Sequence, residues 1–128
     1  MINHKRIFLL IAAISGFIWV ALGAMTGHNV FSDIHASYFN KAHRYQIVHT
    51  LALLTTTVFP NNVLSSWWYL TTGYLWSLGL CCFCGSLYIM AFVSSLDIRF
   101  VVPIGGIAFL LGWMMLFVTA YTTSTRNV

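Results

Sequence analysis

Long apolar segments alternate with short polar ones along the whole chain. Four of the apolar segments have about the length of a membrane-spanning helix, roughly 20 residues. Pro60 ends the second segment within a Pro-Asn-Asn turn, and Pro103 opens the fourth, where a first-turn proline costs least. The pattern predicts an all-α protein, an integral membrane four-helix bundle that forms one domain over residues 1–128. The predicted helices cover about residues 7–27, 42–59, 67–93 and 103–123.

Between the first two predicted helices the chain turns polar. Over residues 28–41, aromatic and aliphatic side chains recur at the spacing of a short amphipathic turn, and Ser32 and Asp33 are suited to begin a helix. We therefore expect a short interfacial segment here, followed by the second membrane helix from Ala42.

The second predicted helix has two different faces. At helical spacing Tyr45, His49 and Thr56 fall on one side, whereas Leu51 and Leu54 fall on the other. A polar side chain in hydrocarbon has no water to bind, so the polar side is expected to face the protein interior. This pattern indicates where a site would lie, but it does not indicate a reaction.

Composition places the chain outside the soluble class. Of its 128 residues 59% are hydrophobic and only 6% are charged, whereas charged residues make up roughly a quarter of soluble domains. The lipid bilayer is therefore the expected environment, and four spans leave no room for a separate soluble domain. The net charge of +4 comes from scattered Lys and Arg residues, which is typical of topology signals. A nucleic-acid partner is not expected.

Basic residues near the helix ends bear on orientation. Four spans place both termini on one side of the membrane and the other two loops opposite. Because the first helix usually dominates topology, we expect cytoplasmic termini. The six basic residues divide equally between the two sides, as Lys5, Arg6 and Arg126 against Lys41, Arg44 and Arg99.

Small residues recur along one face of several predicted helices. The longest such row is Gly73, Ser77, Cys81 and Gly85, which steps by four and predicts close contact with another helix. Similar rows occur in the first and fourth helices. The predicted helix-packing residues are Gly16, Gly23, Gly27, Gly73, Ser77, Cys81, Gly85, Gly105, Gly106 and Gly112.

Polar residues from different helices are expected to meet at the same end of the bundle. At a rise of about 1.5 Å per residue, His49 would lie about 10 Å below a helix start at Ala42. We predict a polar pocket in that leaflet. Its candidate residues are His28, Arg44, Tyr45, Gln46, His49, Ser86, Tyr88, Asp97 and Arg99.

The chemistry of this pocket is open from the residues alone. His49 is suited to bind a metal, to ligate haem together with His28, or to relay protons, and it is equally suited to an interhelical hydrogen bond. Cys81 and Cys82 point about 100° apart on a helix, so one ion is not easily held by Cys81, Cys82 and Cys84 together. Catalytic motifs and paired carboxylates are missing from the sequence. We expect no enzyme activity, no metal and no cofactor.

Four short motifs also match a known pattern. They are Gly23-Ala24-Met25-Thr26-Gly27-His28, Arg44-Tyr45-Gln46-xx-His49, Cys84-Gly85-Ser86-Leu87-Tyr88 and Pro103-Ile104-Gly105-Gly106. Together they resemble the YgdD-like family of small bacterial inner-membrane proteins (domain of unknown function family 423), over about residues 11–115. The resemblance implies four transmembrane helices and a location in the plasma membrane, and the family has no established activity. The chain departs from the family pattern at Met25, Thr26 and Gly27, and Cys84 stands where serine is common.

Packing features outnumber chemical ones, which favours a non-enzymatic interaction or accessory subunit. Such a subunit would contact a membrane-protein partner or form a homo-oligomer. Two alternatives remain: a small oligomeric transporter or channel that moves protons or a small solute through the pocket, and a haem or metal-binding membrane protein.

Overall fold

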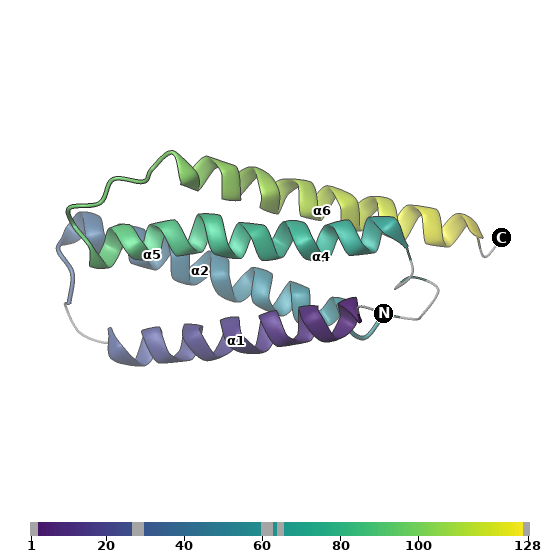
Figure 1. The fold of residues 1–128 in the computed structure, drawn as a ribbon, viewed down its shortest axis with the longest axis horizontal. Coiled ribbons are helices and arrows are strands. Elements are labelled where there is room, and N and C mark those ends of the chain that lie inside the picture. The colour runs from purple at the N-terminus through teal and green to yellow at the C-terminus, as the bar shows by residue number, and fades with distance from the viewer. Residues whose placement is uncertain (1–2, 27–29, 60–62, 64–65, 127–128) are drawn as a thin grey trace.

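The computed structural model describes residues 3–26, 30–59, 63 and 66–126. Within this part of the chain four helical rods lie side by side, alternate in direction, and place both ends of the chain at the same end of the bundle (Figure 1). The prediction of an all-α four-helix bundle is thus confirmed. The rods are α1 (His4–Met25), α2 (Asp33–Thr56), the continuous series α4 (Trp67–Gly79), η1 (Leu80–Cys84) and α5 (Gly85–Phe92), and α6 (Val101–Arg126).

Helix α1 begins a little earlier than expected. The side chain of Asn3 accepts a hydrogen bond from the backbone N of Arg6 at 3.2 Å and so caps the helix. Lys5 and Arg6 therefore belong to the first turn of α1 and do not precede it. The other end of the predicted first helix, at Gly27, lies outside the described residues.

Helix α2 differs most from the prediction. It begins at Asp33, with Ser32 as the N-cap, and continues to Thr56. No proline or glycine interrupts this stretch, so the predicted interfacial segment and the predicted second helix form one continuous helix. The side chain of Ser32 makes no capping hydrogen bond, and its carbonyl accepts the first bond of the helix, from Ala36 N at 2.8 Å.

The third rod contains a widened turn that the sequence analysis did not anticipate. Residues Leu80–Cys84 form a π-helical turn between α4 and α5. Its cysteines diverge, since Cys81 is exposed, Cys82 is half-buried and Cys84 is buried.

Helix α6 begins at Val101 and reaches Arg126. Pro103 is its third residue, still within the first turn, where backbone N–H groups have no partner inside the helix. At the opposite end of the bundle Trp67 is 72% exposed at the start of α4, the usual place of an aromatic belt in membrane helices, whereas Tyr69 is 1% exposed and belongs to the core.

Three rods are long and apolar enough to cross a membrane: His4–Met25, Trp67–Phe92 and Val101–Thr123. Helix α2 does not reach the same hydropathy because it contains Asp33, Lys41 and Arg44 as well as buried polar side chains. Gln46, His49 and Thr50 are each 4% exposed. In the same part of the helix the exposed side chains are apolar, with Val48 and Leu51 about half exposed. Nearer its start, α2 exposes Asp33, Lys41 and Arg44.

Candidate functional site

Gln46 is the centre of a polar cluster that joins three rods. Its Nε2 donates to the backbone O of Ser15 in α1 at 2.9 Å and to Ser15 Oγ at 3.2 Å. Its Oε1 accepts from the hydroxyl of Tyr88 in α5 at 2.5 Å. Ser15 Oγ in turn lies 2.6 Å from Thr50 Oγ1. Both ends of the buried amide are therefore occupied, and α1, α2 and α5 are held in one register.

A second link joins α1 and α2 one turn away. The indole N–H of Trp19 donates to the backbone O of His43 at 2.9 Å, and Nε2 of His43 lies 3.0 Å from the backbone O of Trp19. A carbonyl only accepts, so this imidazole is protonated on Nε2. The two rings stack with centroids 4.6 Å apart. This reciprocal pair adds a second fixed point between the two helices.

His49 lies between α2 and α6, and both of its ring nitrogens are in use. Nδ1 is 2.8 Å from the backbone O of Tyr45, which can only accept, so Nδ1 holds the proton. Nε2 then accepts from the indole N–H of Trp113 at 3.1 Å. The ring of Phe109 stacks on the imidazole at 3.6 Å between centroids. In this arrangement His49 is a neutral imidazole whose two ring nitrogens are both hydrogen-bonded.

The structure brings together only some of the candidate pocket residues. Gln46 and Tyr88 are bonded to each other, and His49 lies one turn further along α2. Ser86 donates to backbone carbonyls of its own helix, those of Cys82 and Phe83. His28 lies outside the described residues.

The other candidates lie outside this cluster. Arg44 is exposed, whereas Asp97 pairs with Arg99 and Tyr88 bonds to Gln46. Tyr45 is 46% exposed and packs beside Phe83, with ring centroids 4.7 Å apart. The cluster is therefore smaller than the predicted pocket.

The cluster also lies deeper than expected. Helix α2 starts at Asp33 and not at Ala42, so His49 lies sixteen residues into the helix, or about 24 Å along its axis. Its contacts Phe109 and Trp113 come from the middle of α6. The polar cluster is consequently near the middle of the bundle and not close to one end.

Three of the predicted packing glycines, Gly73, Gly105 and Gly112, lie tightly against another helix. A Cβ at Gly73 would come within 3.0 Å of the Phe8 ring, and one at Gly112 within 3.0 Å of the Trp76 ring. At Gly105 it would lie 2.7 Å from both Cα and Cβ of Phe83, and closer still to its backbone N. Gly79, which the sequence analysis missed, is filled in the same way by Phe109.

The remaining predicted packing positions are looser. A Cβ at Gly23 would lie 3.2 Å from the His43 ring, one at Gly106 3.7 Å from the Phe83 ring, and one at Gly16 3.9 Å from Thr50. Gly27 lies outside the described residues.

By contrast, the row Ser77, Cys81 and Gly85 borders a groove of about 420 Å³ that no described side chain fills. The other wall of the groove is formed by isoleucines of α1, Ile14 and Ile18 among them. A Cβ at Gly85 would meet, among the described residues, only the Leu80 carbonyl of its own rod, at 4.0 Å. Because Cys81 and Ile14 are exposed, the groove opens on the outer side of the bundle, where lipid would be.

The floor of this groove is polar. Ser15, Gln46 and Tyr88 line it together with the apolar walls. These three residues are hydrogen-bonded to one another through Gln46, so the floor is part of the cluster described above. A mainly apolar cavity of this size with a few polar groups has the character of a binding site.

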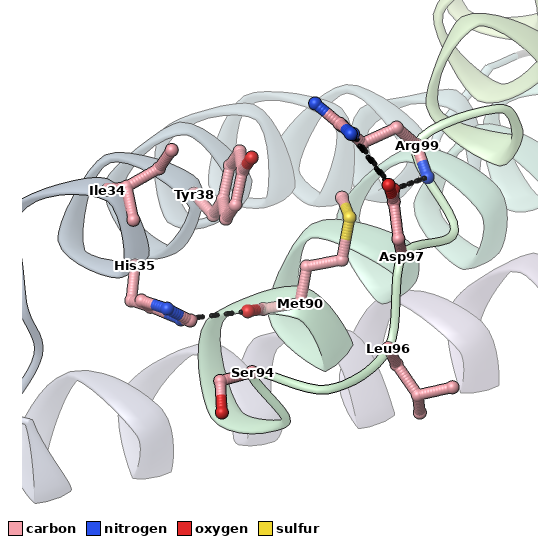
Figure 2. A pocket seen from close by; sticks show the side chains of 8 residues that line it. All are labelled: Ile34, His35, Tyr38, Met90, Ser94, Leu96, Asp97 and Arg99. Atoms are coloured by element: carbon pink, nitrogen blue, oxygen red, sulfur yellow. Dashed lines mark hydrogen bonds and ion pairs between the residues drawn. The ribbon is translucent and has the colours of Figure 1, made fainter.

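Asp97 and Arg99 form an exposed ion pair in the loop between α5 and α6 (Figure 2). Arg99 Nη2 donates to Asp97 Oδ2 at 2.6 Å and Nε donates to Oδ1 at 2.8 Å. These side-chain hydrogen bonds, together with one from the Arg99 backbone N, hold the pKa of Asp97 below its usual range. The pair is part of a small surface pocket, separate from the buried cluster.

Several residues of the cluster were not expected from the sequence. Ser15, Thr50, His43 and Trp113 each complete a hydrogen bond to another helix. Of these four, only Ser15 and Thr50 could have been predicted, because small hydroxyl side chains within apolar helices form hydrogen bonds across helices in lipid. Across the described residues no group of three or more His, Cys, Asp or Glu side chains is placed to hold a metal ion.

Comparison with known proteins finds one matching family and several similar membrane proteins. The family described as "Protein of unknown function (DUF423)" matches residues 21–106. The inner membrane protein YgdD of Escherichia coli K12, a UPF0382 protein, is 37% identical over 97% of this chain and 96% of its own length. UPF0382 membrane proteins of Haemophilus influenzae and Staphylococcus saprophyticus are 35% and 31% identical over 88% and 91% of this chain, and over 91% and 98% of their own lengths. No solved structure was found to match. The chain belongs to the DUF423 family, the YgdD-like membrane proteins of unknown function.

Proposed function

We propose that this protein is a non-enzymatic interaction subunit of the bacterial inner membrane, and that its lateral groove accepts a transmembrane helix that presents an aromatic side chain. The termini are cytoplasmic in this proposal, and α2 is the fourth span. The apolar outer face of α2, with Val48 and Leu51 half exposed, supports its place in the bilayer.

One contrast supports the choice of occupant. Gly73, Gly79 and Gly112 each lie under an aromatic ring of a neighbouring helix of the same chain. The row Ser77, Cys81 and Gly85 has the same small residues but borders unfilled space. Small residues at such spacing allow close approach of helices in membranes. The row extends over about 12 Å, two helical turns, which suits the crossing of one helix.

The hydrogen bonds of the polar cluster favour a binding role over a chemical one. Gln46 and His49 have donors and acceptors matched by neighbours at both ends. A proton relay through His49 would have to break the bond to Trp113 or the bond to the Tyr45 carbonyl. The cluster is therefore suited to fix the helices that shape the groove.

Photo-crosslinking in native membranes tests the proposal. A small diazirine amino acid at position 81 should form an adduct with a protein, and the same residue at position 110, on the outer face of α6 where Leu110 is 69% exposed, should not. Gly85→Leu, which fills the groove, should abolish the adduct at position 81 while the bundle still unfolds at an unchanged temperature. The mass of the adduct tells whether the partner is a second copy of this chain.

Two results would overturn the proposal. Adducts with lipid alone at both positions would mean that the groove is filled by acyl chains. A protein adduct at position 81 that persists in Gly85→Leu would mean that the contact lies outside the groove.

A further inference from the structure

A second cavity, of about 240 Å³, lies at the end of the bundle formed by the start of α2 and the loop after α5 (Figure 2). His35 closes its inner side. Its Nδ1 lies 3.0 Å from the backbone O of Met90 and 3.2 Å from that of Ala91, carbonyls in the last turn of α5. This bond ties α2 to the end of α5 and gives the pocket a fixed wall.

The ion pair on the opposite side of the pocket is only partly satisfied. A guanidinium has five N–H donors, and Asp97 occupies the Nε–H and one Nη2–H of Arg99. Among the described residues nothing else is bonded to the edge made by Nη1 and the second Nη2–H, which has the fork geometry that binds a phosphate in two places. Asp97 accepts three bonds, two on Oδ1 and one on Oδ2, so Oδ2 retains a lone pair.

The surroundings of the pair favour a position at the membrane interface. Exposed apolar side chains flank the two charges along the loop: Leu96 is 50% exposed and Phe100 is 72% exposed. Ile34 of α2 lines the same pocket and is 59% exposed. Charged groups set among exposed apolar ones are typical of a segment that lies at the boundary between headgroups and acyl chains.

We propose that this pocket binds the headgroup of a phospholipid that has both a phosphate and a primary ammonium, as in phosphatidylethanolamine. The phosphate lies on the free edge of Arg99, with the Tyr38 and Ser94 hydroxyls as neighbouring donors. The ammonium donates to Oδ2 of Asp97. Ile34 and Leu96 contact the upper part of the acyl chains. None of these residues lines the lateral groove, so the inference is independent of the proposed function.

The charge pair distinguishes this headgroup from its common alternatives. Phosphatidylglycerol has the phosphate but no cation, so the Asp97 carboxylate would face an uncompensated negative charge. Phosphatidylcholine has a cation without N–H donors, so Oδ2 would lose its hydrogen bond. An exposed charge contact of this kind corresponds to an affinity difference of about two- to fivefold.

Native mass spectrometry of the full chain in mild detergent, titrated separately with the dioleoyl forms of the three lipids, tests the inference. Phosphatidylethanolamine should bind about two- to fivefold more tightly than the other two. Asp97→Asn should remove this preference, and Arg99→Gln should weaken the binding of all three lipids because each has the phosphate. Arg44→Gln, an exposed cation of α2 outside the pocket, is the matched control and should leave all three affinities unchanged.

Three outcomes would contradict the inference. Equal affinity of the unmodified chain for the three lipids would show that the ion pair selects no headgroup. The same loss in Arg44→Gln as in Arg99→Gln would show that positive charge alone is sensed. Soluble glycerophosphoethanolamine should not displace the lipid, and displacement at equal concentration would show that the acyl contacts contribute nothing and that no lipid is specified.

Discussion

Replacing Gly105 by alanine should destabilise the bundle, whereas the same change at its neighbour Gly106 should not. At position 105 the new methyl group would lie 2.7 Å from Cα and Cβ of Phe83 and closer still to its backbone N. These atoms belong to the π-helical turn Leu80–Cys84 and cannot rotate away. At position 106 the methyl group would meet the Phe83 ring at 3.7 Å, which is ordinary contact.

The two substitutions share every other effect. Alanine is favoured over glycine in a helix by about 1 kcal/mol, and this gain applies at both positions. Overpacking costs about 1–3 kcal/mol, and contact with backbone puts Gly105→Ala at the upper end. The free energy of unfolding should therefore fall by about 2 kcal/mol in Gly105→Ala and rise by up to about 1 kcal/mol in Gly106→Ala. The difference of about 3 kcal/mol corresponds to roughly 10 °C between their unfolding temperatures.

Thermal unfolding in one detergent, followed by circular dichroism, measures this difference. A second comparison separates backbone from side-chain crowding. The three atoms nearest to the methyl group of Gly79→Ala all belong to the ring of Phe109, so Phe109→Ala should restore part of the loss. Phe83→Ala should not restore Gly105→Ala, since the backbone N and Cα remain. A Gly105→Ala variant that unfolds at the wild-type temperature would mean that α6 does not lie against the π-helical turn.

Three further predictions concern the polar groups. Tyr88→Phe removes one interhelical hydrogen bond to Gln46 and should lower the free energy of unfolding by about 0.6 kcal/mol, measured by unfolding in detergent, and a loss above roughly 2 kcal/mol would contradict a single bond of this kind. Nitrogen NMR of labelled histidine should show His49 neutral and protonated on Nδ1, and a proton on Nε2 would contradict the bond from Trp113. Carbon NMR should place the pKa of Asp97 below that of an ordinary aspartate, and Arg99→Gln should return this pKa toward the ordinary value. The pair with Arg99 is therefore intact above the ordinary pKa and is lost as the pH falls through the lowered one. The other titratable side chains that line the same pocket are His35 and Tyr38.

Local pattern was sufficient to predict the four rods but not the rotation of α2. Ala42, His49 and Thr56 are common to two possible faces, one that also includes Tyr45 and Ala52 and one that includes Gln46 and Leu53. The structure buries the second set, with Gln46 at 4% and Leu53 at 0% exposed, and leaves Tyr45 at 46%. Both faces have alternating steps of three and four residues, so spacing alone does not choose between them. The choice depends on partners in α1 and α5.

Two other features depend on contacts between distant segments. The start of α2 was placed too late because residues 33–41 are polar enough to suggest the membrane surface, although nothing in them breaks a helix. The π-helical turn has no sequence signature of its own. Gly105, which was predicted as a packing residue, shows why the turn matters, because its neighbour is the backbone of Phe83. Glycine positions were thus predictable, but their partners were not.

A polar residue in a membrane helix is a functional hypothesis by default, because burying it costs free energy. Whether the hypothesis holds depends on whether the polar atom still has an unmatched hydrogen-bond donor or acceptor. Gln46 and His49 have their donors and acceptors matched, and their bonds fix α2 against α1, α5 and α6. Arg99 and Asp97 have a free edge and a free lone pair, and they lie at the surface. Among these four residues, the free donors and acceptors lie on the outside of the bundle, which favours recognition of membrane components there over chemistry at Gln46 and His49.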